Sequence, residues 1–258
     1  MHDVDQFEDA LVERFRRHPV LAQVAGLAEA DFAELLLQRR FLSLAFTPVY
    51  DLAIDLLQDE QGRRIARVIL REEYPGRSGR VPSHREDMTE DLRRLGIGNE
   101  RIAASRPTAA TLDAVDATFA LVADAGGRPD SDLRILTVLR FWGEVLVSVE
   151  YTRLWERMAR RLTTEGENRS VFYHPHLLHD AKTAPLAGLS TEPGTHADAL
   201  AARVAALLVD ERSAAVFAEL EERAYRIKAG FYDQFRPALD RAGLMDPVEP
   251  AASARPGS

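Results

Sequence analysis

The stretch DSDLRILTVLRFWGEVLVSVEYTRLWERMARRL, residues 130–162, decides the fold class. It contains no proline, and between Leu133 and Trp155 apolar side chains fall on most sides of a helix drawn through it. A helix with apolar residues on all sides is stable only when other elements bury it. We therefore expect residues 130–162 to form one long helix at the centre of a helical bundle.

Helical periodicity also dominates the rest of the chain. Apolar residues recur at intervals of three and four, and no segment alternates as a half-buried strand does. Thr47 followed by Pro48 suits the start of a new helix, since threonine caps and proline fits the first turn. The further expected helices cover residues 7–17, 30–44, 47–58, 63–74, 84–95, 108–125, 195–208 and 213–242. The sequence predicts an all-α fold with a single domain over residues 1–245, and the composition of residues 246–258 predicts a disordered C-terminal tail.

Charge and composition exclude several classes of function. The net charge is −8 with a pI near 5.5, and basic residues are interleaved with acids, which argues against a nucleic-acid partner. The absence of cysteine excludes disulfides, thiolate metal sites and cysteine nucleophiles. The first residues lack the pattern of a signal peptide, and no apolar run reaches the roughly 20 residues that span a bilayer. We expect a cytoplasmic protein without a membrane partner.

Histidines are concentrated in the stretch VFYHPHLLHDAKT, residues 171–183, which holds three of the seven in the chain. If Pro175 occupies the first turn of a helix, His176 and Asp180 stand one turn apart on the same face. Two side chains of the type that binds metals then point the same way. Spacing alone is modest evidence, because a histidine near a helix start is more often a surface or capping residue.

Glu144 lies in the most apolar part of the central helix, where an unpaired carboxylate is costly to bury. One explanation for its burial is a salt bridge to Arg140, four residues earlier. The other explanation is that Glu144 belongs to a functional site inside the bundle. Glu150 follows six residues later, about 600° around the helix, so we expect only one of the two carboxylates to face an interior site.

Glu72 and Glu73 end another predicted helix, in the sequence ILREEYPG. A carboxylate pair at the C-terminal end of a helix opposes the helix dipole and calls for a positive partner, which a metal ion could provide. His84 and His196 begin two further predicted helices. Carboxylates and imidazoles distributed over several helices are typical of a di-iron site in a helical bundle, and a donor set of oxygen and nitrogen suits iron or manganese better than structural zinc.

The order of these residues resembles the haem-oxygenase-like di-iron oxidases, relatives of thiaminase II and pyrroloquinoline quinone synthase with a bundle of about seven core helices plus accessory helices. The resemblance covers about residues 30–235, although only the ligand segments are specific. It implies that the metal ligands are Glu73, His84, Glu144, His176 and Asp180. It also implies that Glu73 is the ligand and Glu72 a solvated neighbour.

One position departs from the pattern of that family, which has His-x-x-x-Asp-x-x-His where this chain has Thr183 as the last member. The segment GTHADALAARVAALL, which contains His196, matches what normally follows the missing histidine, as if residues 181–194 were inserted. We therefore expect His196 to be the sixth ligand, with His179 as a weaker alternative.

The resemblance implies an enzyme that uses two Fe(II) per chain and O2 to oxidise a small molecule, by C–H or C–C oxidation or by N-oxygenation, in specialised metabolism. An amino acid, an amine or a carboxylic acid would be the substrate, and an electron donor would be a partner; a homodimer is left open. N-oxygenating relatives carry a further glutamate on the helix before the EE segment, where this chain offers only Asp51, which favours carbon oxidation. The substrate-binding residues are unknown, since Tyr50, Tyr74, Phe141 and Tyr173 equally suit core packing.

Two alternatives belong to other classes. One is a metal-free enzyme similar to thiaminase II or pyrroloquinoline quinone synthase, although thiaminase II itself uses a cysteine nucleophile that this chain lacks. The other is a non-catalytic helical ligand-binding protein whose polar residues form satisfied ion pairs. Iron content after anaerobic reconstitution separates the enzyme from both.

Overall fold

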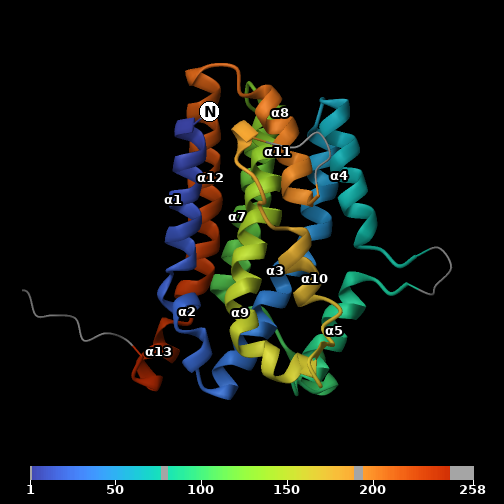
Figure 1. Cartoon of the computed structure of the whole chain (residues 1–258), viewed down its shortest axis with the longest axis vertical. Coiled ribbons are helices and arrows are strands. Elements are labelled where there is room, and N and C mark those ends of the chain that lie inside the picture. Colours follow the sequence, from blue (N-terminus) through green and yellow to red (C-terminus); the bar gives the residue numbers. More distant parts are fainter. Residues whose placement is uncertain (1, 77–80, 189–193, 245–258) are drawn as a thin grey trace, which may run out of the picture.

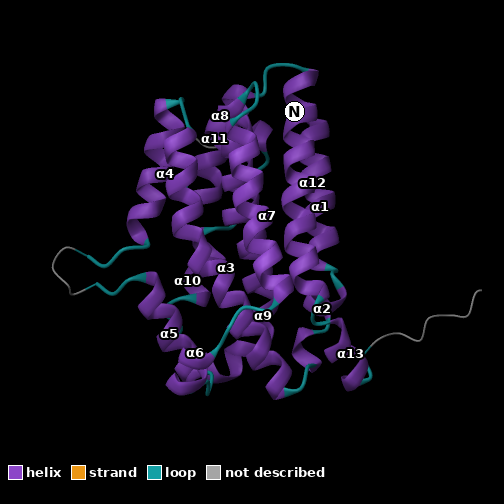
Figure 2. Cartoon of the chain, turned by 180° about the vertical axis from the view of Figure 1, so that it is seen from behind, coloured by secondary structure: helices purple, strands orange, loops and turns teal. Residues whose placement is uncertain are grey.

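The structure is a computed structural model that describes residues 2–76, 81–188 and 194–244. Long helices run along a common direction in Figure 1, and the view from behind in Figure 2 shows the same bundle as almost entirely helical. The predicted all-α fold is confirmed. The expected tail at residues 246–258 lies outside the described residues, as do residues 189–193 of the predicted insertion.

Helices account for nearly all the regular structure of the described residues. A single small hairpin, β1 (Thr163–Thr164) with β2 (Glu167–Asn168), follows the central helix. Short 3₁₀ turns occur at η1 (Val24–Gly26) and η3 (Leu186–Gly188). The α-helices are α1 (His2–Arg16), α2 (Pro19–Ala22), α3 (Glu29–Leu56), α4 (Glu60–Glu72), α5 (His84–Arg94), α6 (Asn99–Ala104), α7 (Ala109–Gly126), α8 (Ser131–Val138), α9 (Leu146–Leu162), α10 (Tyr173–His179), α11 (His196–Leu207), α12 (Glu211–Asp233) and α13 (Arg236–Ala242).

The central helix is continuous from α8 to α9 but changes its winding in the middle. Its segment η2 (Leu139–Val145) is π-helical and completely buried. Elements α3, α8, α9, α11 and α12 all contact this segment, which places it at the centre of the bundle. Short π-helical segments are rare and often accompany functional sites, and this one contains Glu144.

Two predicted helix boundaries are wrong. Helix α3 continues through Pro48 where we expected a restart. Proline cannot donate to the carbonyl four residues before it, but Val49 and Tyr50 are fully buried beside it, and this packing outweighs one lost hydrogen bond. Conversely, the helix predicted over residues 213–242 is broken between α12 and α13, because Pro237 suits the first turn of a new helix.

Packing between distant segments closes the bundle. Helix α1 lies beside α12 in both views and contacts it, so the first and last long helices of the described chain pack together. Fully buried Arg140 of η2 reaches Glu8 of α1 and Glu221 of α12, which ties three elements together by charge. No described helix is both long and apolar enough to cross a membrane.

Candidate metal centre

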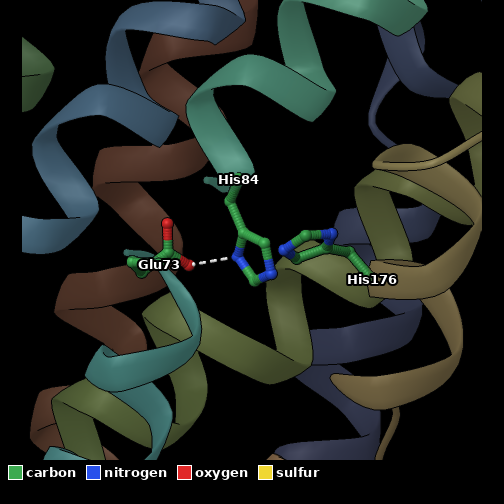
Figure 3. A group of neighbouring side chains, drawn as sticks. All are labelled: Glu73, His84 and His176. Carbon is green, nitrogen blue, oxygen red and sulfur yellow. Dashed lines mark hydrogen bonds and ion pairs between the residues drawn. The ribbon is translucent and has the colours of Figure 1, made fainter. Parts of the chain in front are cut away.

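Three predicted ligands meet where α4 ends, α5 begins and α10 passes. Glu73, His84 and His176 each offer one ligand atom, and these atoms lie within 4.8 Å of one another. His84 Nδ1 lies 2.8 Å from Glu73 Oε1, and the rings of His84 and His176 lie 4.6 Å apart between centroids. Figure 3 shows the three side chains turned toward one another from separate ribbons. We call these three residues the first cluster.

Helix caps place two of the three side chains. Glu73 is the C-terminal cap residue of α4, and the helix stops just before Pro75. Ser83 caps α5 by accepting from the backbone N–H of Glu86, while the Glu86 carboxylate accepts from the backbone N–H of Ser83. This reciprocal cap fixes the first residue of the helix, and that residue is His84.

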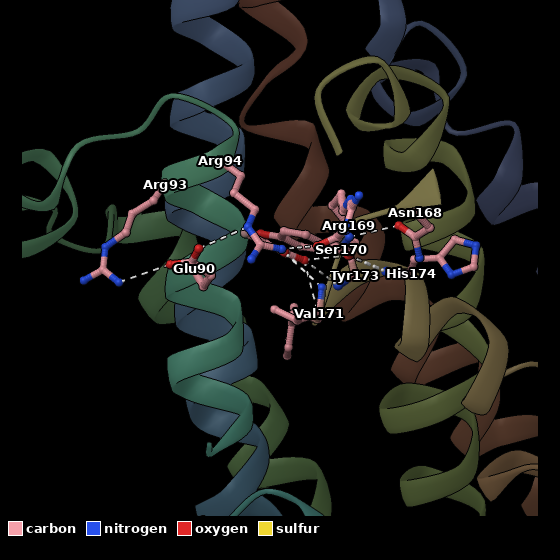
Figure 4. Close-up of polar contacts among 11 residues, drawn as sticks. Glu90, Arg93, Arg94, Asn168, Arg169, Ser170, Val171, Tyr173 and His174 are labelled. Atoms are coloured by element: carbon pink, nitrogen blue, oxygen red, sulfur yellow. Dashed lines mark hydrogen bonds and ion pairs between the residues drawn. The ribbon is translucent and has the colours of Figure 1, made fainter. Parts of the chain in front are cut away.

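Asp91 of α5 holds α10, the helix that carries His176. Its fully buried carboxylate accepts from the Ser170 hydroxyl at 2.6 Å and from the backbone N–H groups of Val171, Phe172 and Tyr173 at 3.0–3.2 Å. Backbone N–H groups at the start of a helix have no partner within the helix, and a negative charge beside them stabilises the helix. Figure 4 shows the same junction, where Arg94 of α5 also donates to the backbone oxygen of Arg169. Helices α5 and α10, which carry His84 and His176, are therefore coupled directly.

The ring of His176 is held in one tautomer. Its Nδ1 lies 2.7 Å from the backbone oxygen of Phe172, and because a carbonyl oxygen only accepts, Nδ1 carries the proton. The Nε2 lone pair is then free for the cluster. Burial and the charge of His84 lower the pKa of His176 to about 3, so the ring is neutral at ordinary pH. A neutral imidazole with its other nitrogen bonded to a carbonyl is the form that binds metals.

The second cluster consists of Glu144, Asp180 and His196, whose ligand atoms also lie within 4.8 Å of one another. His196 Nδ1 is 3.6 Å from a carboxylate oxygen of Glu144 and 3.6 Å from one of Asp180. Tyr50 of α3 donates to the other oxygen of Glu144. Glu144 and Asp180 are almost completely buried, and Thr195 caps α11 so that His196 is its first residue.

Charge is concentrated in the second cluster. Burial and the neighbouring Glu144 raise the pKa of Asp180 well above its usual value. Burial alone would lower the pKa of His196, but hydrogen bonds and charge from Asp180 and Glu144 raise it to about 11. Two buried carboxylates thus share one nearby cation in this arrangement. A divalent cation would relieve the remaining repulsion.

The structure brings all six predicted ligand residues into these two clusters. His179, the alternative to His196, lines the same cavity but belongs to neither cluster, and its ring lies 6.0 Å from that of His196. Thr183, where the resemblance has histidine, donates to Asp198 instead. Glu72 is largely exposed, although its Oε2 lies 3.3 Å from His196 Nε2.

The structure also tests the expectations about residues near the candidate ligands. The suggested pair between Glu144 and Arg140 is wrong, because Arg140 pairs with Glu8 and Glu221. Glu144 lines the cavity and Glu150 does not, as expected from their spacing. Tyr74 lines the cavity, whereas exposed Asp51 does not. Sequence patterns did not reveal the roles of Asp91 and Tyr50, which act on ligands far away in the chain.

Both clusters open on one cavity of about 430 Å³. All six predicted ligands contribute to its lining. The remaining wall is largely apolar and aromatic, with Leu42, Phe46, Ile69, Met88, Trp142, Val147, Tyr151 and Phe172. A volume of this size accommodates a small molecule.

No protein-family model and no curated protein match the chain. Among solved structures, a CADD-like protein of unknown function from Nostoc punctiforme PCC 73102 matches 93% of this chain and 98% of its own, with a TM-score of 0.63 and 14% identity. A TenA homologue from P. horikoshii OT3 matches 92% of this chain and 98% of its own, with a TM-score of 0.55 and 14% identity. A TenA family transcription regulator from Silicibacter sp. TM1040 matches 90% of this chain and 94% of its own, with a TM-score of 0.54 and 14% identity.

The chain has the helical fold of the CADD-like and TenA proteins. This is the fold expected from the resemblance to the haem-oxygenase-like proteins. At 14% identity the likeness shows the fold alone, so the function depends on the residues of the site.

Proposed function

We propose that this protein is a non-haem di-iron oxidase or oxygenase that uses two Fe(II) ions and O2 to oxidise a small molecule. The observation that carries the proposal is the pair of three-residue clusters on the wall of one cavity. Six side chains from five separate segments of the chain converge there, and each is of a type that binds iron. A purely structural role does not require so many ligand groups around one space.

The residues fit two divalent cations. Glu73, His84 and His176 would hold one ion, and Glu144, Asp180 and His196 the other. All donors are oxygen or nitrogen, which suits Fe(II). His176 is neutral with Nε2 free, so no proton competes for that position. The close Glu144 and Asp180 carboxylates favour positive charge beside them; protonated His196 supplies it in the metal-free chain, and a divalent ion would supply it once His196 gives up that proton to become a ligand.

Iron would supply the electrons and orbitals that the reaction of O2 requires. The chain itself supplies position and a partly apolar environment. Tyr50 orients Glu144 by its hydroxyl, and the Phe172 carbonyl fixes the ring of His176. The apolar part of the wall would shield a bound substrate from water. Since Asp51 does not line the cavity, no additional carboxylate of α3 reaches it, which favours carbon oxidation over N-oxygenation within this proposal.

Metal content tests the proposal against a metal-free enzyme or a ligand-binding protein. We expect wild-type protein reconstituted anaerobically with Fe(II) and desalted to retain about two ions per chain. His176→Gln should lose about one of them, because the first cluster then keeps only two ligands. His174→Gln is the matched control, since His174 lies on the same helix against Trp155 and belongs to neither cluster. Absence of bound iron in the wild-type protein would refute the proposal.

A further inference from the structure

A third group of buried charges lies beside the two clusters. Arg39 of α3 and Lys228 of α12 both pair with Glu150 of α9, on different oxygens of the same carboxylate. The Tyr232 hydroxyl donates to Glu150 as well, at 3.1 Å. All four side chains are almost completely inaccessible to bulk solvent.

The charges of this group do not balance. Two cations face one carboxylate, which leaves a net charge of about +1 in a region where an uncompensated charge is expensive. Burial lowers the pKa of Lys228 to about 8 against the opposing effect of Glu150, so the ammonium form still predominates at neutral pH. The carboxylates of the clusters do not supply the missing charge once metals are bound, because three carboxylates face two divalent ions.

Both cations belong to the wall of the cavity. Arg39 and Lys228 line it, whereas their shared partner Glu150 and the nearby Tyr232 do not. Trp142 lies beside them, with Lys228 Nζ 5.1 Å from its ring centroid. The indole N–H of Trp142 is buried and has no hydrogen-bond partner among the described residues. The wall therefore offers excess positive charge together with a donor that lacks an acceptor.

The positive wall and the candidate metal centre line the same cavity. The apolar side chains of Leu42, Phe46 and Val147 contribute to the lining of the same cavity. A molecule with an anionic end and an apolar body matches this distribution.

We propose that the substrate is a small carboxylate whose anionic group binds Arg39 and Lys228, while its apolar body extends toward the two clusters. This inference rests on the proposed function and narrows its substrate from an amino acid, amine or carboxylic acid to a molecule that carries a free carboxylate. A free amine alone would meet two like charges at this wall. The body of the substrate, and not its carboxylate, is then presented for oxidation.

Ligand binding without turnover tests the inference. The probes are hexanoate, octanoate and decanoate, each compared with the primary amine of equal length, and the readout is calorimetry on metal-free protein and on protein loaded anaerobically with Fe(II). We expect carboxylates to bind more tightly than the amines. Lys228→Met should weaken carboxylate binding about 10-fold or more, since it removes a charged hydrogen-bond donor. Glu150 keeps Arg39 as a partner in this variant.

Matched variants separate substrate binding from core stability. Arg39→Met leaves Glu150 paired with Lys228 and should show the same loss, so a folding defect in one variant does not decide the test. Tyr232→Phe removes a hydrogen bond from the same carboxylate without removing charge from the cavity, and its carboxylate affinity should equal that of the wild type. Far-ultraviolet circular dichroism and thermal unfolding verify the fold of each variant.

The outcomes distinguish this inference from the proposed function. Carboxylate binding that is unchanged in folded Lys228→Met and Arg39→Met would overturn the inference, as would wild-type protein that binds two iron ions and none of the three carboxylates. Carboxylate binding that depends on Lys228 in a protein that retains no iron would support the carboxylate site and refute the di-iron oxidase.

Discussion

Neighbouring residues in the sequence EEYPG have different environments. Glu73 faces His84 and His176 inside the bundle, whereas the side chain of Glu72 is 43% exposed and lies 3.3 Å from His196. The difference arises at the end of α4, where one residue of rotation separates the interior from the surface. The sequence placed both carboxylates at a helix end, but only the family resemblance indicated which of the two to expect as the ligand.

Paired substitutions test this assignment. Glu73→Ala should remove one of the three donors of the first cluster and lower iron retention after desalting by about one ion per chain. Glu72→Ala should retain the wild-type iron content, because Glu72 belongs to neither cluster. Inductively coupled plasma mass spectrometry on the two variants provides the measurement. Loss of iron from Glu72→Ala with full retention by Glu73→Ala would reverse the assignment.

Two helices have features that sequence patterns alone could not predict. The central helix was predicted from its apolar composition, but its π-helical turn at Leu139–Val145 depends on tertiary packing that no local pattern encodes. Similarly, the local signal at Pro48 predicted a break in α3 that burial of the neighbouring residues overrides. The junction of α5 with α10 joins residues about 80 positions apart, so spacing gave no sign that Asp91 caps the helix of His176.

Asp91→Asn tests whether this junction holds the first cluster together. An amide presents one accepting oxygen and a donor group toward hydrogen-bond donors, so several of the four bonds to Asp91 are lost. We expect the free energy of unfolding to fall by about 2–3 kcal/mol. Urea denaturation measures this loss, and faster hydrogen exchange at residues 171–176 locates it.

Glu90→Gln is the control for that substitution. Glu90 precedes Asp91 but forms only surface pairs with Arg93 and Arg94, which contribute about 1 kcal/mol or less. Hydrogen exchange of the Glu90→Gln variant over residues 171–176 should match that of the wild type. Equal stability of Asp91→Asn and Glu90→Gln would show that the cap does not support α10.

For the molecule as a whole, the bundle brings six candidate ligands from five segments of the chain to the wall of one cavity. The all-α fold was predictable because helical periodicity runs through the chain, and the same fold occurs in proteins only 14% identical to it. The six candidate ligands were predictable because their residue types and order resemble a known family. The positive wall of Arg39 and Lys228 could not be predicted from the sequence, because a buried cation in an amphipathic helix has the same sequence pattern as a cation on the surface.

The central claim is that the two clusters each hold an iron ion, and anomalous diffraction tests it most directly. Crystals grown anaerobically with Fe(II) should give two peaks in maps measured above the iron absorption edge. The account predicts one peak among Glu73, His84 and His176 and the other among Glu144, Asp180 and His196. Iron peaks away from both clusters, or the absence of any peak there at saturating Fe(II), would contradict it.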